Sequence, residues 1–119
     1  MIKLPRGNTL NLNIVLKDRD GKPYALSEKD HAIFTVKYND DRNEVPLIQK
    51  IIKNSDCGAN GELQLRLAPQ DTIALETGYY LYDIAVCIGG NDFYTTVVAD
   101  MFQILPALSD MGVGTYGGN

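Results

Sequence analysis

The stretch that decides the fold is Thr77–Val86, TGYYLYDIAV, with three tyrosines among four consecutive residues. Successive side chains of a β-strand point to opposite faces, so alternate residues of this stretch share a face. One of the two faces ends in purely aliphatic residues and is expected to be buried. Burial of five such side chains contributes about 8–15 kcal/mol of gross hydrophobic stabilisation, comparable with the net stability of a domain. We therefore expect this face to lie inside the protein rather than to form a stacking platform for a sugar or a base: Tyr80, Tyr82, Ile84, Val86 and Ile88.

A buried phenol also needs a hydrogen-bond partner for its hydroxyl group. Tyr80 begins the strand directly after a corner, a position similar to that of the tyrosine corner in immunoglobulin-like domains. There, a tyrosine at the start of a late strand bonds back to the backbone of the preceding corner. We expect Tyr80 to have this structural role. The alternative is a ligand clamp formed by Tyr79 and Tyr80, which requires both rings to line one pocket.

Period-two alternation recurs along the chain and predicts about seven short strands. Turn signals separate several of them, such as DRDG at residues 18–21 and GGND at residues 89–92. Pro69 followed by Asp71 predicts one short helical turn at a corner. No segment is long enough for a helix that crosses over between parallel strands, so we expect antiparallel pairing. The expected strands are residues 9–17, 31–38, 47–53, 62–67, 79–88, 93–98 and 99–105.

These elements predict an all-β fold, an antiparallel immunoglobulin-like β-sandwich formed by residues 1–106. Residues 107–119 are rich in glycine and predict a flexible C-terminal tail. Within the tail, GVGTYG at residues 112–117 matches the G-x-G-x-x-G dinucleotide pattern letter for letter. That pattern binds a pyrophosphate only between a strand and a following helix, and no helix can follow here. We therefore expect no nucleotide cofactor.

Composition excludes several classes of partner. Hydrophobic residues make up 45% of the 119 residues and charged residues 22%, which is typical of one globular domain. The net charge of −4 and the lack of a basic cluster argue against nucleic acid, because phosphate contacts come from Lys and Arg. No apolar run approaches the ~20 residues of a membrane span. The N-terminal MIKLPRGNTL lacks the apolar core of a signal peptide, so we expect the chain to begin in the cytoplasm.

The residues that could carry catalysis or bind metal are few. His31 is the single histidine, so neither a zinc site nor a Ser–His–Asp triad has its usual complement of ligands or partners. Asp18 and Asp20 resemble part of a calcium loop, but the spacing from Gly21 puts unsuitable residues at the other ligand positions, and we expect a plain turn. Cys57 and Cys87 allow one disulfide, although two free thiols are expected of a cytoplasmic protein. We expect no catalytic residue, no metal site and no cofactor.

Several short motifs, in order along residues 6–105, resemble a group of small phage proteins. They match immunoglobulin-like β-sandwich proteins of tailed phages and prophages, similar to the N-terminal domain of baseplate upper proteins. Asn8 departs from the aspartate that is usual at this place in the group. The motifs that carry the resemblance are Arg6-Gly7-Asn8-Thr9, Leu16 to Pro23 (LKDRDGKP), Phe34-Thr35-Val36-Lys37, Leu67 to Thr72 (LAPQDT), Gly78 to Ile84 (GYYLYDI) and Phe102-Gln103-Ile104.

The resemblance implies a non-catalytic structural or assembly protein of a phage or prophage, associated with the tail or baseplate. Its partners would be other phage structural proteins or copies of itself, and its location the virion or the host-cell cytoplasm. Exposed apolar positions on the strands are then the candidate contacts: Ile33, Leu81 and Phe93. The alternative is a bacterial immunoglobulin-like adhesion or carbohydrate-binding module, which predicts exposed aromatic residues in a row.

Asp83 is the most unusual polar residue of the chain, because aspartate is depleted in strands. One interpretation is that its face of the strand is exposed to solvent. The other is that it lies at a subunit contact, paired with a base such as Arg66 or Lys37. We include Asp83 among the candidate interface residues.

Overall fold

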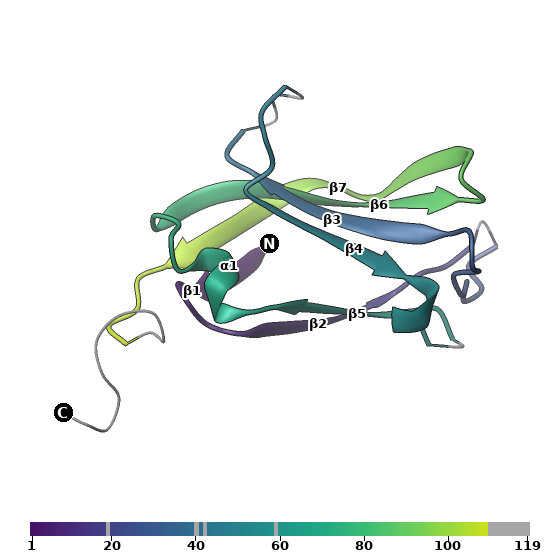
Figure 1. The fold of residues 1–119 in the computed structure, drawn as a ribbon, viewed down its shortest axis with the longest axis horizontal. Coiled ribbons are helices and arrows are strands. Elements are labelled where there is room, and N and C mark those ends of the chain that lie inside the picture. Colours follow the sequence, from purple (N-terminus) through teal and green to yellow (C-terminus); the bar gives the residue numbers. More distant parts are fainter. Residues whose placement is uncertain (19, 40, 42, 59, 110–119) are drawn as a thin grey trace.

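The computed structural model describes residues 1–18, 20–39, 41, 43–58 and 60–109. The described chain is mostly β and forms two sheets that face one another (Figure 1). The larger sheet has the strand order β1-β7-β6-β3-β4, and the smaller consists of β2 and β5. The strands are β1 Ile2–Pro5, β2 Leu10–Val15, β3 His31–Lys37, β4 Ile48–Lys53, β5 Glu62–Leu67, β6 Gly78–Ile88 and β7 Asp92–Leu105.

The core lies between the two sheets, and the alternation of β6 decides which side chains enter it. The rings of Tyr80 and Tyr82 are only 5% and 9% exposed, and Ile84 and Val86 are buried beside them. The predicted inward face of this strand is therefore confirmed, with Ile88 half-buried at its end. The other large core side chains come from β5 in the facing sheet and from β3 and β7 in the same sheet: Leu63, Leu65, Leu67, Phe34, Val36, Phe102 and Ile104.

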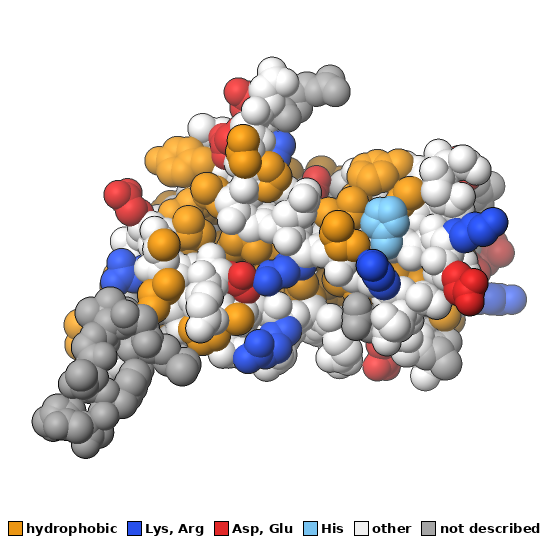
Figure 2. Space-filling view, in the orientation of Figure 1, with side chains coloured by type: hydrophobic (Ala, Val, Ile, Leu, Met, Phe, Trp, Pro, Cys, Tyr) orange, Lys and Arg blue, Asp and Glu red, His pale blue; other side chains and the backbone are white. Residues whose placement is uncertain are grey.

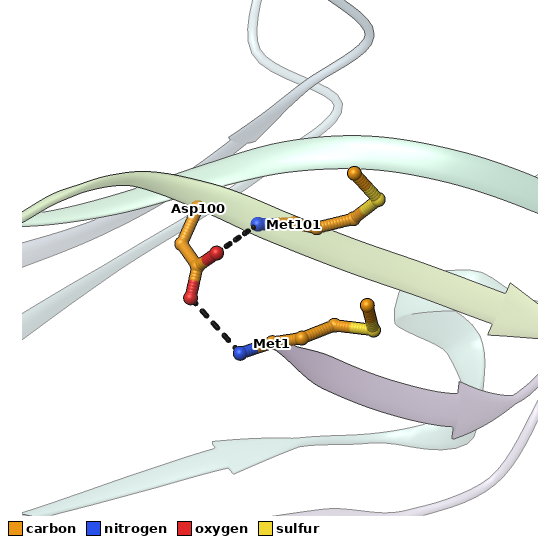
Figure 3. Close-up of polar contacts among 3 residues, drawn as sticks. All are labelled: Met1, Asp100 and Met101. Carbon is orange, nitrogen blue, oxygen red and sulfur yellow. Dashed lines mark hydrogen bonds and ion pairs between the residues drawn. The ribbon is translucent and has the colours of Figure 1, made fainter.

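The expectation of purely antiparallel pairing is wrong at one place, because β1 pairs with β7 in parallel from Ile2↔Phe102 to Pro5↔Leu105. A parallel pair needs a long connection between its strands, and here the whole intervening domain supplies it. The amino group of Met1 also donates a hydrogen bond to the Asp100 carboxylate at 2.9 Å, and the Met101 amide donates to its other oxygen (Figure 3). The parallel pairing and the bond from Met1 to Asp100 hold the first strand beside the last, which the four residues ending in Pro5 do not predict.

Residues 93–98 and 99–105 were expected to be separate strands, but they form the single strand β7. Its pairing with β6 shifts register twice, between Tyr82 and Ile84 and again between Ile84 and Ala85. Such irregularities increase the local twist of a strand without ending it. They explain why the alternation is interrupted near Val98 while the pairing with β6 continues.

The corner between β5 and β6 contains the predicted helical turn, α1 Pro69–Thr72. The Asp71 carboxylate accepts a hydrogen bond from the Ala68 amide at 2.7 Å. It also forms an ion pair with the Lys50 ammonium group at 3.0 Å. The buried hydroxyl of Thr72 accepts from the Gly7 amide at 2.8 Å. The helical turn thus ties β4 and the segment after β1 to this corner. A second short turn, the 3-10 helix η1 Asn54–Asp56, follows β4.

Two backbone segments approach Gly61 so closely that a larger side chain there would clash with them. Its φ is +76°, and a Cβ atom there would lie 2.6 Å from the Tyr24 carbonyl oxygen and 2.8 Å from that of Leu16. Gly21 has a similar φ of +82° but nothing within 4 Å of the same position.

We expect Gly61→Ala to lower the free energy of unfolding by about 3 kcal/mol or more, because backbone strain and a backbone clash add. Gly21→Ala should cost only the strain, about 1 kcal/mol. Urea denaturation of both variants measures the difference. Equal losses would show that the approach of residues 16 and 24 to residue 61 is wrong.

Candidate interaction surface

The outer face of the five-stranded sheet brings together all four candidate interface residues. Ile33, Leu81, Asp83 and Phe93 line one hollow of about 400 Å³. They meet there because the odd-numbered residues of β3 and β6 lie on the outer face of the sheet, although Ala85 is itself buried. Ile33 pairs with Ala85, Thr35 with Asp83, and Phe93 on β7 with Cys87. The other residues that line the hollow are Thr35, Lys37, Asn39, Pro46, Gln49, Tyr82, Ala85 and Ala99.

The hollow is open on the side that faces away from β2 and β5. β2 and β5 cover the opposite face of the larger sheet, and no described strand or helix packs over this one (Figure 1). The connection between β3 and β4, which contributes Asn39 and Pro46, projects from this face and forms one wall. Phe93, 62% exposed, lies near the other end of the hollow. Figure 2 shows apolar side chains along the upper edge of the molecule, on both sides of the projecting connection.

Asp83 is half-buried in the middle of this face. Its burial raises the pKa of the carboxyl group, and the nearby Lys37 ammonium opposes the rise only in part. An acid whose pKa is raised in the folded state is ionised at neutral pH at a cost to stability, and that cost disappears as the pH falls. The fold alone therefore gains nothing from this carboxylate.

Of the two bases considered as partners of Asp83, the structure places one nearby. Lys37 pairs with Leu81 and so lies diagonally across from Asp83 on the neighbouring strand. Its amino group also donates to the Asp41 carbonyl oxygen at 3.4 Å. Arg66 is exposed on β5 in the other sheet, opposite Asn11, and cannot serve the same carboxylate.

The hydroxyl of Tyr80 donates to the carbonyl oxygen of Glu76 at 2.6 Å, four residues back in the corner before β6. This is the type of bond expected for a tyrosine corner. Burial raises the pKa of Tyr80, and the charge of Glu76 raises it further. Tyr79 points to the opposite face and is 61% exposed, so the two rings do not share a pocket and the ligand clamp is wrong.

Sequence reasoning missed Asp30, which is only 4% exposed. Its carboxylate accepts hydrogen bonds from the Tyr24 hydroxyl at 2.8 Å, the Ser27 amide at 2.9 Å and the Gly89 amide at 2.8 Å. Burial by itself raises the pKa of Asp30, but the bonds from Ser27, Gly89 and Tyr24 outweigh it and lower the pKa to about 2. The pattern Ser27-x-x-Asp30 signals the local bond, whereas nothing in the pattern indicates the bond to the β6–β7 hairpin.

The other motifs have structural settings. One oxygen of Asp18 accepts from the amides of Asp20 and Lys22, both at 2.9 Å, as in an ordinary turn. Cys57 and Cys87 are unpaired. Among the described residues, no group of three or more His, Cys, Asp or Glu side chains could hold a metal ion. In the same part of the chain, no helix is long and apolar enough to cross a membrane. The GVGTYG motif and residues 110–119 of the expected tail lie outside the described residues.

Comparison of the chain with protein families, with curated proteins and with solved structures returned no match. A function for this surface therefore has to be argued from its own residues and geometry.

The Tyr80 hydroxyl can be tested against a matched tyrosine on the same strand. Tyr80→Phe should lower the free energy of unfolding by about 1 kcal/mol, because it removes the bond to Glu76 and leaves a carbonyl group unsatisfied. Tyr82→Phe should change it by less than about 0.5 kcal/mol, because that hydroxyl forms no hydrogen bond with the described residues. Thermal or urea unfolding measures both, and a larger loss for Tyr82→Phe would contradict the assignment.

Asp30 should make the fold sensitive to acid. Because its pKa falls from 3.8 to about 2 on folding, its contribution is complete above about pH 5 and is lost as the pH falls through 2. We expect this loss to be about 2 kcal/mol. Urea unfolding between pH 6 and pH 2 should show a shallower acid slope for Asp30→Asn.

Asp18→Asn is the control for Asp30→Asn, because an asparagine keeps the oxygen that accepts both turn bonds at this exposed position. It should leave the acid slope close to that of the parent chain. An unchanged slope in Asp30→Asn would show that the triple hydrogen bond does not form.

Proposed function

We propose that this chain is a non-catalytic structural or assembly protein of a tailed phage or prophage particle, associated with the tail or baseplate. The outer face of the larger sheet would be the surface by which it joins a neighbouring subunit. The observation that carries the proposal is the convergence of Ile33, Leu81, Phe93 and Asp83 on one uncovered hollow. A broad, open, mostly apolar sheet face with few charges suits contact with another protein.

The phage resemblance includes an immunoglobulin-like sandwich, and the strand pairing supports this finer assignment. In immunoglobulin domains, strands B and E pair in one sheet, while strands C, F and G form the other, joined in variable-type domains by C′. Here β2 and β5 pair in one sheet, and β4, β3, β6 and β7 follow the order C′-C-F-G in the other. We therefore propose that β6 is strand F and that Tyr80, bonded to Glu76, is its tyrosine corner.

The same alignment offers a reason for the core aromatics. Two residues after its corner tyrosine, an antibody domain has the second cysteine of its inter-sheet disulfide, against which a tryptophan of strand C packs. The corresponding residue here is Tyr82, and its ring lies 5.7 Å from that of Phe34 on β3. Aromatic packing would then hold the region that a disulfide holds in antibody domains.

An adhesion or carbohydrate-binding module remains the weaker alternative. Sugar-binding surfaces need aromatic rings side by side, and among the described residues the most exposed rings do not form one row, although Tyr24 and Tyr94 line a second hollow of about 420 Å³. Tyr79 pairs with Gln103 at one end of β6, and Phe93 pairs with Cys87 near the other end. Tyr94 pairs with Val86 on the opposite face of the sheet from Phe93 and is 56% exposed.

Co-sedimentation tests the proposed role. In the strain that carries the gene, an epitope-tagged chain should sediment with phage particles or tails in a density gradient after prophage induction. Leu81→Glu places a charge in the hollow and should move the chain to the unsedimented fraction. Val15→Glu adds the same charge to the exposed side of β2, 49% exposed, and should leave the chain with the particles. Intact particles that never contain the tagged parent chain would refute the proposal.

A further inference from the structure

One edge of the larger sheet is open along the first part of β7. β1 pairs with β7 from Phe102 to Leu105, and the Met1 amino group lies against Asp100, so this part of the edge is occupied. No strand among the described residues pairs with residues 92–99 on the side away from β6. In Figure 1 this segment lies at the β6–β7 hairpin, at the opposite end of the sheet from β1. The N–H and C=O groups along an open strand edge are the groups that an added extended strand binds.

The open segment lacks the side chains that usually prevent pairing between edges. Residues 93–99, FYTTVVA, include no charged residue, no proline and no glycine, and most of them are aromatic or β-branched. The opposite edge of the same sheet is different, because β4 carries Lys50 and Lys53. Lysine on an edge strand opposes the addition of a further strand. Of these two edges, the start of β7 is therefore the one suited to pairing.

The irregular pairing of β7 with β6 limits where a further strand can add. The register shifts on both sides of Ile84, and such bulges bend a strand and interrupt its ladder. Residues 92–95 precede both shifts and pair in regular order with Ile88 to Ala85. A regular ladder on the open edge is therefore expected around residues 93–95, with Tyr94 at its centre.

Tyr94 combines an apolar setting with high exposure. It pairs with Val86 and lines the second hollow together with Tyr24 and Ile88. Its side chain is nevertheless 56% exposed, so much of an aromatic ring beside an apolar hollow remains in contact with water. Tyrosine at such a position is typical of a side chain that becomes buried when a partner binds.

The symmetry of the edge fits a second copy of β7. When an edge pairs with the same edge of another copy, the two strands are antiparallel and related by a twofold axis. Directly opposite residues share a face of the sheet, so the axis passes where one residue meets its own equivalent. At the centre of the regular stretch, Tyr94 meets Tyr94 of the other copy and Phe93 meets its Thr95. Asp92 then meets Thr96 of the other copy, so no like charges lie directly opposite one another.

We propose that the first part of β7 pairs antiparallel with the same segment of a second copy, so that two larger sheets become one continuous sheet across a twofold axis at Tyr94. The same edge of β7 already accepts a strand of this chain, because β1 occupies it from Phe102 to Leu105. Pairing uses up the open segment of both copies, so the contact closes as a dimer and does not extend into a fibre. It is independent of the assembly surface proposed above, because the added sheet lies beside Leu81 and Asp83 rather than over them.

Sedimentation equilibrium of the purified chain tests the contact. The parent chain should form a concentration-dependent dimer. Tyr94→Lys should weaken the dimer by about tenfold or more, because it places two ammonium groups opposite one another on an edge strand. Tyr79→Lys is the matched control, because Tyr79 is 61% exposed but pairs with Gln103 within the sheet, and it should leave the dimer unchanged. Urea unfolding of both variants establishes that each is folded.

A cysteine at the axis tests the register. In a chain that also carries Cys57→Ser and Cys87→Ser, Tyr94→Cys should form a disulfide between copies under mild oxidation. Directly opposite residues of antiparallel strands have Cα atoms about 4.5–5.5 Å apart, which is within the range that a disulfide spans. Phe93→Cys in the same background is the control, because its two equivalents lie diagonally, about 7–8 Å apart, and should cross-link at least about tenfold more slowly.

Three results would overturn the proposed contact. The first is a parent chain that is monomeric up to about 1 mM. The second is a dimer that Tyr94→Lys leaves intact. The third is a disulfide between copies that forms as fast from residue 93 as from residue 94. A dimer that is lost in Tyr94→Lys and retained in Tyr79→Lys, together with preferential cross-linking at residue 94, would establish it.

Discussion

Burial of the inner face of β6 is the interaction on which the rest of the structure depends. This strand pairs with β3 on one side and with β7 on the other, so its side chains lie at the centre of the larger sheet. Tyr82 contacts two aromatic rings, with centroid distances of 5.7 Å to Phe34 and 6.4 Å to Phe102. Three strands of one sheet are thereby joined through a single residue, and the leucines of β5 close the core from the other side.

The same burial determines the outer face. Side chains alternate along a strand, so a shift of one residue in pairing would exchange the two faces of β6. Moving the tyrosines out would expose the apolar core and bury Asp83. The position of Leu81 and Asp83 on the outer surface is therefore a consequence of the core, and the candidate surface needs no structural element of its own.

For this reason the sequence predicts the candidate surface better than it predicts the topology. Alternation is a local pattern, and it correctly separates the buried residues from Ile33, Leu81 and Asp83, which lie together on the outer face. The parallel pairing of Ile2–Pro5 with the end of β7 joins the two ends of the domain. The bond from Gly89 to Asp30 spans 59 residues. Neither contact leaves a periodic pattern, because each depends on how distant segments meet after the sheets have formed.

Asp83 shows how the core and the outer face are energetically connected. Burial raises the pKa of its carboxyl group and the Lys37 ammonium opposes this rise only in part, so keeping Asp83 ionised costs the folded chain some stability. A neutral side chain at this position would remove that cost, but it would also remove the one anion among the described residues that line the hollow.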